Sequence, residues 1–382
     1  MFDQITRRAM LAGTASATAL ALAGEGFAQG AMNWKKFAGA SIEVNLSKSP
    51  RGETLQKYEK EFTDLTGIKV SSEQMPEQQQ RQKVVIELTS GRPSFDVIHM
   101  SYHVQKRQFE KAGWLADLSP FMKDPTVTEP TLVESDFSQA GLLYAKPPSG
   151  EMRSLPFSVD YFMLYWNKEL FQKKNLQVPT TFEELVKASE ALTDAKEGQF
   201  GIVGRGLRNA NLPFWANFLM GYGGDHMDSK GNLTTDSPEA IEATKLFQLL
   251  LTKYAPPGVA GFNWAESQSA FLQGKVGMWM DGVGFAPPLE DPTKSRIVGK
   301  VGYAVVPKGP KGQAAATFGD GIGVVEASKN KGAAYLYCQW AISKTMGARL
   351  LQSGSGVPFR HSVLNDAEVR KGVTMPAAWV EA

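Results

Sequence analysis

The sequence predicts an α/β protein made of two lobes that short segments of chain connect. Strand-like runs alternate with amphipathic helical runs along most of the chain, which is the pattern of sheets with crossover helices. The 382 residues exceed what one hydrophobic core usually serves. Leu155-Pro-Phe-Ser-Val-Asp-Tyr-Phe-Met-Leu-Tyr-Trp166 is a long strand-like run that suits a crossing between lobes. We therefore expect two α/β lobes.

Residues 1–28 predict an export signal of the twin-arginine kind. Thr6-Arg-Arg-Ala-Met-Leu-Ala12 places paired arginines ahead of an apolar stretch, residues 10–23, and small residues suit a peptidase that cuts after Ala28. The alternative, a short helix of the folded domain, fits poorly because the stretch has little 3.6-residue periodicity. The stretch is also too short and too weakly apolar to span a membrane. Removing these 28 of the 382 residues leaves 354, and we expect that mature protein in the periplasm.

The first part of the mature chain is predicted to fold as β-α-β-α-β. The segments that carry this pattern, strands alternating with helices, are residues 41–46, 53–65, 68–73, 78–88 and Gly91-Arg-Pro-Ser-Phe-Asp-Val-Ile-His-Met100. The first helix is predicted to end at Gly67, and the helix after Met100 at Gly113. Because ligands bind beyond the carboxyl ends of strands in open α/β sheets, the end of the strand before Met100 is a predicted binding place.

The remaining chain alternates in the same way. Thr181 and Glu184 have capping-box spacing at a helix start, and Ser237-Pro-Glu starts another helix by placing proline first. Later segments predict strands and then helices, at residues 274–281, 301–306, 318–325, 331–342 and around Gly347.

Composition and charge exclude several classes of function. The chain carries 41 Lys and Arg against 39 Asp and Glu, and no basic run is interleaved with aromatics, so no nucleic-acid partner is expected. The single cysteine, Cys338, forms no internal disulfide and lies in an apolar helical stretch that predicts a buried thiol. The four histidines lack metal-ligand spacing, and neither a nucleotide-binding glycine loop nor a Gly-x-Ser-x-Gly elbow occurs. We expect no metal, no cofactor and no catalytic motif.

Eight short motifs follow one another between about residues 41 and 360. They are Phe62-Thr-Asp-Leu-Thr-Gly-Ile-Lys-Val70, Glu87-Leu-Thr-Ser-Gly91, Ser94-Phe-Asp-Val-Ile98, Ala112-Gly-Trp-Leu-Ala-Asp-Leu118, Tyr165-Trp-Asn-Lys-Glu-Leu-Phe171, Pro179-Thr-Thr-Phe-Glu-Glu-Leu185, Ala270-Phe-Leu-Gln-Gly-Lys-Val276 and Lys329-Asn-Lys-Gly-Ala-Ala334. Each motif alone has little specificity, but eight in order are hard to obtain by chance. This succession resembles family 1 extracellular solute-binding proteins, the maltose-binding-protein-like receptors of ATP-driven importers.

The resemblance implies a two-lobed periplasmic-binding-protein fold of type II, with a mixed sheet flanked by helices in each lobe and a three-segment hinge. It also implies a ligand in the cleft between the lobes, closure on binding, and delivery to a membrane permease. On this basis the first lobe is expected to hold residues 41–157 and 285–317, and the second residues 158–284 and 318–382. A monomer is expected.

The chain departs from the family pattern in two places. Sugar binders of the family often carry Gly-Gly-Trp at the third hinge crossing, whereas this chain has Phe318-Gly319-Asp320, so a carboxylate replaces a stacking aromatic. The chain also stops at Ala382, whereas relatives commonly continue into a further helical tail. A truncated sequence and a differently capped lobe are both open.

A polyhydroxylated ligand needs aromatic faces for its C–H surfaces and side chains that pair with its hydroxyls. In the first lobe, Tyr102 and His103 follow the strand that ends at Met100, and the resemblance places His103 where the maltose binder has a sugar-contacting acid. A solvated helix start is the alternative for both. Ser47 is a further candidate in the loop after the first strand, although serines in such loops often only cap the next helix.

Further candidates lie in the predicted second lobe. Asp160 interrupts an apolar run, so its carboxylate must be hydrogen-bonded or face the cleft; we expect a ligand contact. Trp264 stands where relatives often have a cleft aromatic, with packing against the lobe as the alternative. Strand alternation puts Trp279 and Asp281 on one face, and Asp281 is favoured because Trp279 suits the core equally well.

The resemblance places Phe285 and Asp320 at the second and third crossings, where both would line the cleft. A hinge aspartate that caps a helix or binds backbone is the alternative for Asp320. Arg205 and Arg208 flank Gly206, and an arginine at the lip of a cleft can hold hydroxyls, a carboxylate or a phosphate through its fork of donors. An exposed loop charge is the alternative, which we favour for Arg208.

The sequence thus predicts a periplasmic receptor of an ABC importer that captures a sugar or sugar alcohol. The missing hinge tryptophan favours a polyol or a short saccharide. The alternative ligand is an anionic solute such as a sugar phosphate, which Arg205 favours and the aspartates at 160, 281 and 320 together disfavour. A secreted glycosidase-like enzyme is a further, less favoured alternative, because a pair of carboxylates at suitable separation can act as acid and base.

Overall fold

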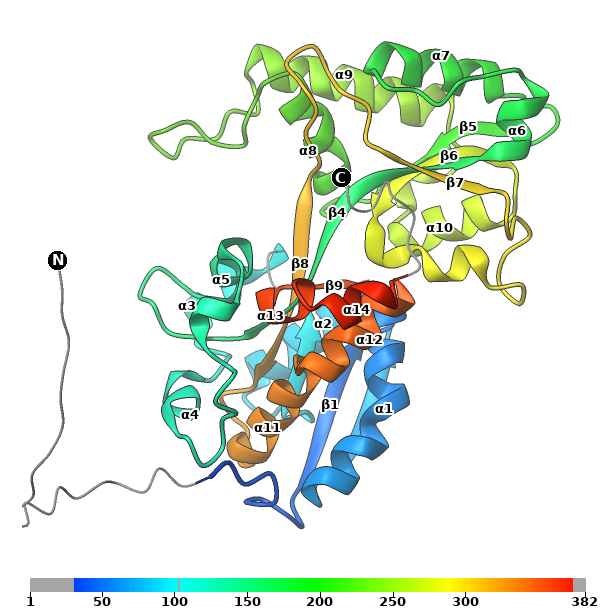
Figure 1. Cartoon of the computed structure of the whole chain (residues 1–382). Helices are drawn as coiled ribbons and strands as arrows, with labels where there is room; N and C mark the ends of the chain where they lie inside the picture. The colour runs from blue at the N-terminus through cyan, green and yellow to red at the C-terminus, as the bar shows by residue number, and fades with distance from the viewer. Residues whose placement is uncertain (1–30, 102–103, 374–382) are drawn as a thin grey trace, which may run out of the picture.

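A computed structural model describes residues 31–101 and 104–373, which form two lobes, one above the other in Figure 1. The buried apolar side chains of these residues form one large cluster in each lobe, and a smaller cluster lies beneath α2 (Glu77–Ser90) and α3 (Lys106–Ala112) of the first lobe. The two α/β lobes predicted from the alternation of strands and helices are therefore present.

The first lobe is built on a sheet with the strand order β2-β1-β3-β8-β4, to which β4 (Leu155–Asn167) and β8 (Thr317–Val324) come from later in the chain. β1 is parallel to β2 and β3, whereas β8 is antiparallel to β3 and β4. Val97 and Ile98 of β3 point into different clusters, because successive side chains of a strand alternate between its faces. The elements up to the hinge are β1 (Ser41–Ser47), α1 (Pro50–Thr66), β2 (Lys69–Met75), α2 (Glu77–Ser90), β3 (Val97–Met100), α3 (Lys106–Ala112), α4 (Ser119–Lys123), η2 (Glu134–Asp136) and α5 (Gln139–Ala145).

The second lobe has its own strands around the far half of β4 (Leu155–Asn167). There β4 is antiparallel to β6 on one side and to β7 on the other, and β5 is parallel to β6. Helices α7 and α9 lie above these strands in Figure 1. The elements are α6 (Lys168–Lys173), α7 (Phe182–Leu192), β5 (Phe200–Val203), α8 (Leu212–Gly221), α9 (Pro238–Lys253), η3 (Val259–Gly261), α10 (Trp264–Leu272), β6 (Val276–Gly282), η4 (Val283–Phe285), η5 (Pro287–Glu290) and β7 (Val301–Val305).

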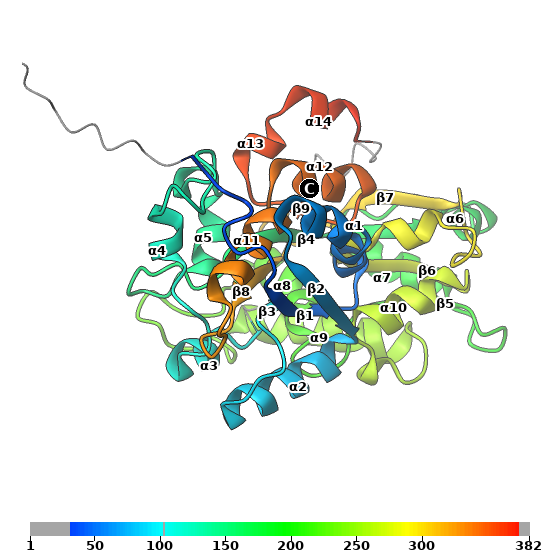
Figure 2. The same cartoon turned by 90° about the horizontal axis from the view of Figure 1, so that it is seen from below.

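Neighbouring strands form the hinge between the lobes. Ser158 of β4 pairs with Asp320 of β8 on one side and with Pro358 of β9 on the other. In the view from below, the first-lobe sheet and the helices that follow β8 lie together around this hinge (Figure 2). The elements from the hinge to the end of the described chain are β8 (Thr317–Val324), α11 (Lys331–Ala341), α12 (Lys344–Ser353), β9 (Val357–Pro358), α13 (His361–Leu364) and α14 (Ala367–Lys371).

The two cores divide the chain differently from the predicted lobe boundaries. Residues 285–317 were expected in the first lobe, but Leu289 and Val301 belong to the second core because β7 pairs with β4 beyond the hinge. Residues 318–382 were expected in the second lobe, but Ile322, Val324 and the buried apolar side chains of α11 lie in the first core, because β8 pairs with β3 and α11 is buried beside it. The chain therefore does not cross at Phe285; it returns to the first lobe at β8.

Local signals for helix ends were read correctly in most cases. Gly113 ends α3 with a φ of 62°, a conformation that glycine adopts without strain. Ser237 caps α9, and the hydroxyl of Thr181 accepts from the backbone N–H of Glu184 at the start of α7. The carboxylate of Glu184 accepts from Thr180 instead of returning to Thr181, so only half of the predicted capping box forms.

Three further findings concern the classes of function considered above. Cys338 is buried in α11, and burial raises the pKa of its thiol. Within residues 31–101 and 104–373, no helix is both long and apolar enough to cross a bilayer. The same residues bring no group of three or more His, Cys, Asp or Glu side chains together in a way that suits a metal ion.

Candidate functional site

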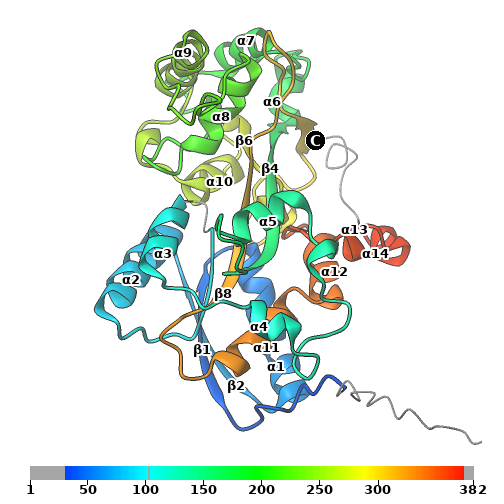
Figure 3. The ribbon, with the colours of Figure 1, turned by 90° about the vertical axis from the view of Figure 1, so that its left-hand side faces the viewer.

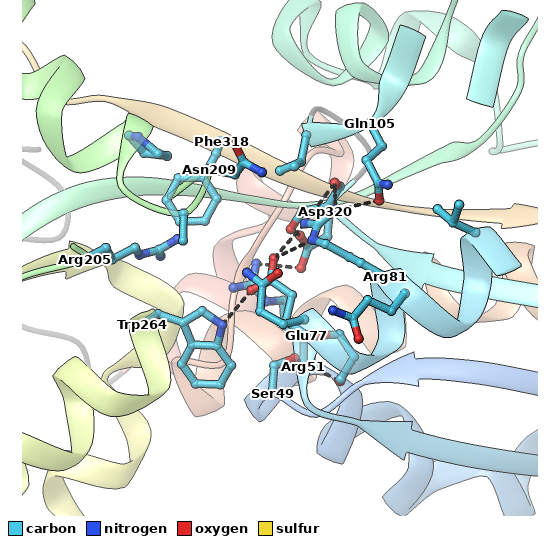
Figure 4. Close-up of a pocket in the computed structure, with 18 of the residues that line it drawn as sticks. Ser49, Arg51, Glu77, Arg81, Gln105, Arg205, Asn209, Trp264, Phe318 and Asp320 are labelled. Carbon is cyan, nitrogen blue, oxygen red and sulfur yellow. Dashed lines mark hydrogen bonds and ion pairs between the residues drawn. The ribbon is translucent and has the colours of Figure 1, made fainter. Parts of the chain in front are cut away.

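A pocket of about 570 Å³ lies between the lobes, where strands of both sheets end. In the first lobe, the segments that follow β1 and β3 line the pocket. In the second lobe, the segments that follow β5 and β6 line it. Figure 4 shows the side chains of both lobes pointing toward one another across it. The pocket is lined by Ser47, Ser49, Arg51, Glu77, Gln78, Arg81, Gln82, Val85, Ile86, Ser101, Val104, Gln105, Gln108, Arg205, Asn209, Ala210, Pro213, Trp264, Phe285, Phe318 and Asp320.

Arg51 joins the first lobe to the hinge at the base of this pocket. It lies in the first turn of α1, which Ser49 caps, and its side chain is buried. One terminal nitrogen binds Asp160 of β4, and the other lies 3.1 Å from a carboxylate oxygen of Asp320 of β8. Asp160 also accepts the backbone N–H of Gly284 at 2.8 Å. Arg51 thus ties together two hinge strands and the segment that follows β6.

Burial and charge act in opposite directions on this cluster. Burial alone raises the pKa of Asp320, but Arg51, His99 and Ser101 outweigh it, so that pKa lies well below the ordinary range. For Asp160, burial outweighs the attraction of Arg51, and the pKa is raised. Burial lowers the pKa of Arg51, but the two carboxylates more than compensate and raise it overall. The guanidinium therefore stays charged, with Asp320 as its firmly ionised partner.

Arg205 occupies the opposite wall, in the loop after β5. Its Nε donates to both carboxylate oxygens of Asp281 at 3.1 and 3.0 Å, and a terminal nitrogen binds the same carboxylate. The guanidinium carbon lies 4.9 Å from the ring centre of Phe318 and 5.5 Å from that of Phe285. Burial lowers the pKa of Arg205, but the charge and hydrogen bonds of Asp281 raise it further than burial lowers it. Asp281 thereby fixes the direction in which Arg205 faces the pocket.

Glu77 is the first residue of α2 and reaches across to the second lobe. It accepts from Arg81 Nη2 at 2.6 Å within its own helix and from Asn263 Nδ2 at 3.1 Å in the second lobe. It also accepts from Trp264 Nε1 at 2.9 Å across the pocket (Figure 4). Burial raises the pKa of Glu77, but Arg81 and other donors lower it overall. Trp264 in turn stacks on Phe285, with ring centres 4.6 Å apart and planes 10° apart.

Half of the residues predicted from the sequence are brought together in the pocket. The residues that line it are Ser47, Arg205, Trp264, Phe285 and Asp320. Phe285 does so from η4 of the second lobe rather than from a hinge crossing, and Asp320 from the second crossing rather than the third. Tyr102 and His103 lie outside the described residues. Arg208 is exposed, as expected.

The other predicted contacts do not line the pocket. Asp160 and Asp281 are fully buried behind it, where they hold Arg51 and Arg205. Trp279 is buried in the second core, stacked 4.6 Å from the ring of Tyr165. Strand alternation correctly put Trp279 and Asp281 on one face of β6, but that face is covered by the lobe's own side chains. The structure gives the two aspartates a supporting position instead of a direct contact.

Sequence reasoning missed Arg51, Glu77 and Arg81, whose charged groups lie at the centre of the pocket in Figure 4. All three stand in the first two turns of helices that follow the parallel strands β1 and β2, and these helix starts face the edge where ligands bind. Ser47 was predicted to lie in the loop between the first strand and the first helix, and Pro50 follows it closely in the chain. An arginine one residue later was therefore a signal that could have been used.

This arrangement suits a neutral solute with many hydroxyl groups. The arginines that line the pocket are each paired with a carboxylate of the protein, so an added anion would have to compete for them. Side chains that can donate to and accept from hydroxyl groups also line the pocket, among them Gln78, Gln82 and Asn209. Trp264 stacks on Phe285, and the Arg205 guanidinium lies near Phe285 and Phe318, so part of the aromatic surface is already covered and hydrogen-bonding groups make up much of the remaining wall.

Comparisons with known proteins agree with this arrangement. A family model described as a bacterial extracellular solute-binding protein matches residues 47–348. A probable amino-acid ABC transporter periplasmic-binding protein of Sinorhizobium fredii is 29% identical over 88% of this chain and 76% of its own length. An erythritol/L-threitol-binding protein of Mycolicibacterium smegmatis is 25% identical over 95% of this chain and 83% of its own. The crystal structure of an ABC transporter solute-binding protein of Agrobacterium radiobacter in complex with ribitol is 26% identical, with a TM-score of 0.77 over 88% of this chain and 84% of that one.

Proposed function

Because the chain belongs to the family of bacterial extracellular solute-binding proteins, we propose that it is the receptor of an ABC importer that captures a sugar or sugar alcohol. The resemblance predicted from the eight motifs is confirmed, and so is the two-lobed α/β fold. One similar protein is named for erythritol and L-threitol, and the crystal structure of another is a complex with ribitol. Both support a polyol as the ligand of this chain as well.

The pairing of the pocket arginines is the observation that carries the choice of ligand. Arg51, Arg81 and Arg205 each face a carboxylate partner from the protein. A neutral solute can bind beside these pairs through hydroxyl groups, which both donate and accept, without displacing a carboxylate. A phosphate would have to share a guanidinium with the carboxylate that already holds it, and drawing the guanidinium away would leave that carboxylate without its partner, which is costly. The pocket therefore favours a neutral polyhydroxy solute over a sugar phosphate.

The proposed receptor captures its solute by closing both lobes around it. Solute contacts from Arg51 and Asp320 at the hinge and from Arg205 in the second lobe favour the arrangement in which the lobes meet around the pocket. The strands β8, β4 and β9 absorb the change in angle. The membrane permease then distinguishes the closed form by the relative positions of the lobe surfaces. Nothing in this sequence of events breaks a bond in the solute, and we propose a receptor rather than an enzyme.

The cellular route belongs to the same proposal. The paired arginines and the apolar stretch before Ala28 support export by the twin-arginine route and cleavage near Ala28. The mature protein then acts in the periplasm, as a monomer that meets a permease. Mass spectrometry of the intact protein recovered from the periplasm would test the cleavage site, because cleavage at any other residue would give a different mass.

A thermal-shift screen tests the proposed ligand class. The mature protein is heated with polyols, monosaccharides, disaccharides, sugar phosphates and, because of the name of the Sinorhizobium relative, amino acids. Binding to the native state raises the melting temperature by mass action, and we expect the largest rise with a neutral polyol or sugar. The bound compound should be recovered unchanged. A rise confined to sugar phosphates or amino acids, or recovery of a cleaved product, would overturn the proposal.

A further inference from the structure

Glu77 joins the two lobes across the pocket by side-chain hydrogen bonds. Its own helix, α2, belongs to the first lobe, whereas its partners Asn263 and Trp264 stand at the start of α10 in the second. Figure 3 shows α2 and α10 approaching each other on the same side of the hinge. The bridge therefore lies away from the hinge strands. A contact at a distance from the hinge restricts the angle between the lobes more than the same contact beside the hinge.

The bridge is well supported on both sides. Arg81 holds the carboxylate of Glu77 through Nε at 3.2 Å and Nη2 at 2.6 Å, so the charge is compensated within the first lobe. The stacking of Trp264 on Phe285 fixes the direction of the indole N–H in the second lobe. The carboxylate also lies at the amino-terminal ends of α2 and α10, where helix dipoles favour a negative charge.

We propose that Glu77 is a positioning residue that latches the lobes together and thereby sets the fraction of closed protein before solute binds. Both sides of the bridge are protein atoms, so its formation requires no solute atom. Since apparent affinity scales with the population of the binding-competent form, the latch also sets the affinity for solute. This inference rests on the proposed function, because the angle between the lobes matters to a receptor that closes on its ligand.

A purely local role for Glu77 makes different predictions. If Glu77 served only to pair with Arg81 in α2, changing its partners in the second lobe would leave the angle between the lobes unchanged. Two substitutions in α10 separate these roles. Trp264→Phe keeps a ring to stack on Phe285 but removes the N–H, and Asn263→Asp keeps a good helix cap but places a second carboxylate beside Glu77.

The test measures the distance between the lobes in the absence of solute. Spin labels on cysteines introduced at Thr89 of α2 and Ile241 of α9, both exposed, report the separation by pulsed electron resonance. Cys338 is buried and does not compete for the label. Trp215→Phe is the matched control, because its indole N–H donates at 3.1 Å to Thr244 within the second lobe.

We expect the wild-type protein to populate a short separation, and both α10 variants to lower the ratio of closed to open protein on the order of ten-fold. The Trp215 variant should match the wild-type distribution. A wild-type protein that is wholly open, or variants with the wild-type distribution, would overturn the latch. Because no solute is present in this test, its failure is distinct from failure to find a ligand in the thermal-shift screen.

Discussion

Arg51, in the first turn of α1, forms a buried ion pair with Asp160, which lies where β4 passes from one lobe to the other. The two residues are 109 positions apart in the chain, and neither side chain is more than 2% exposed. Asp320 of the neighbouring hinge strand lies on the same guanidinium. The hinge is thus centred on one charge cluster that also forms part of the wall of the pocket.

Arg51→Ala should therefore destabilise the protein strongly. The substitution leaves Asp160 and Asp320 buried without their cation, and breaking a buried pair in this way typically costs about 3–5 kcal/mol. Urea unfolding measures the change in the free energy of unfolding. Lys60→Ala is the control, because Lys60 pairs with Asp64 on the surface and that loss should be near zero. Equal losses in the two variants would contradict this account of the hinge.

Asp320 should give the stability a defined dependence on pH. Its pKa in the folded protein lies below that in the unfolded chain, about 3.9, so its ionisation stabilises the fold above about pH 4, and this stabilisation is lost progressively as the pH falls further. The difference in unfolding free energy between the wild type and Asp320→Asn should accordingly shrink from pH 5 to pH 3. If this difference grew as the pH fell from 5 to 3, the pKa of Asp320 would be raised by folding and not lowered.

Arg205 and Arg208 offer a matched pair for testing the pocket. Arg205→Lys keeps the charge but loses the fork that binds Asp281 and faces the site, so affinity for the solute found in the screen should fall about ten-fold. Arg208→Lys changes an exposed arginine outside the pocket and should leave the affinity unchanged. Isothermal titration compares the two. If the two variants bound the solute with equal affinity, Arg205 would not contribute to solute binding.

Trp279→Phe should affect stability slightly and solute affinity not at all. Trp279 is buried in the second core, so a smaller ring leaves a cavity. Its indole N–H is also buried without an acceptor among the described residues, and removing it relieves part of that cost, leaving a loss of about 1 kcal/mol. Unfolding and titration experiments check both statements. Weaker solute binding with unchanged stability would indicate that Trp279 contacts the solute.

The sequence was informative wherever local pattern decides structure. Helix stops such as Gly113, and the strand alternation that pairs Trp279 with Asp281, depend on neighbouring residues and were read correctly. The partners of buried charges could not be read, because Arg51 meets Asp160 only through the fold of the first lobe. Asp160 was correctly expected to need a partner, but an arginine of the protein fills that role where a ligand was predicted.

The lobe boundaries failed for a related reason. A strand was predicted at residues 301–306 and lies at Val301–Val305, but whether it joins the first or the second sheet depends on its pairing with β4, more than 130 residues earlier in the chain. Glu77 shows the same limit for the site, since its partner Trp264 lies 187 positions away. The positions of strands and helices could be predicted from local sequence pattern. Their contacts with residues far away in the chain could be identified only from the structure.

Calorimetric titration of the mature protein with ribitol and with a phosphate ester of ribitol tests the central claim most directly, because the two solutes differ only in the charged group. With every pocket arginine already paired, we expect the neutral solute to bind at one site and the phosphate ester to bind at least ten-fold more weakly. Tighter binding of the phosphate ester, with no response to ribitol or any other neutral polyol or sugar, would contradict the account.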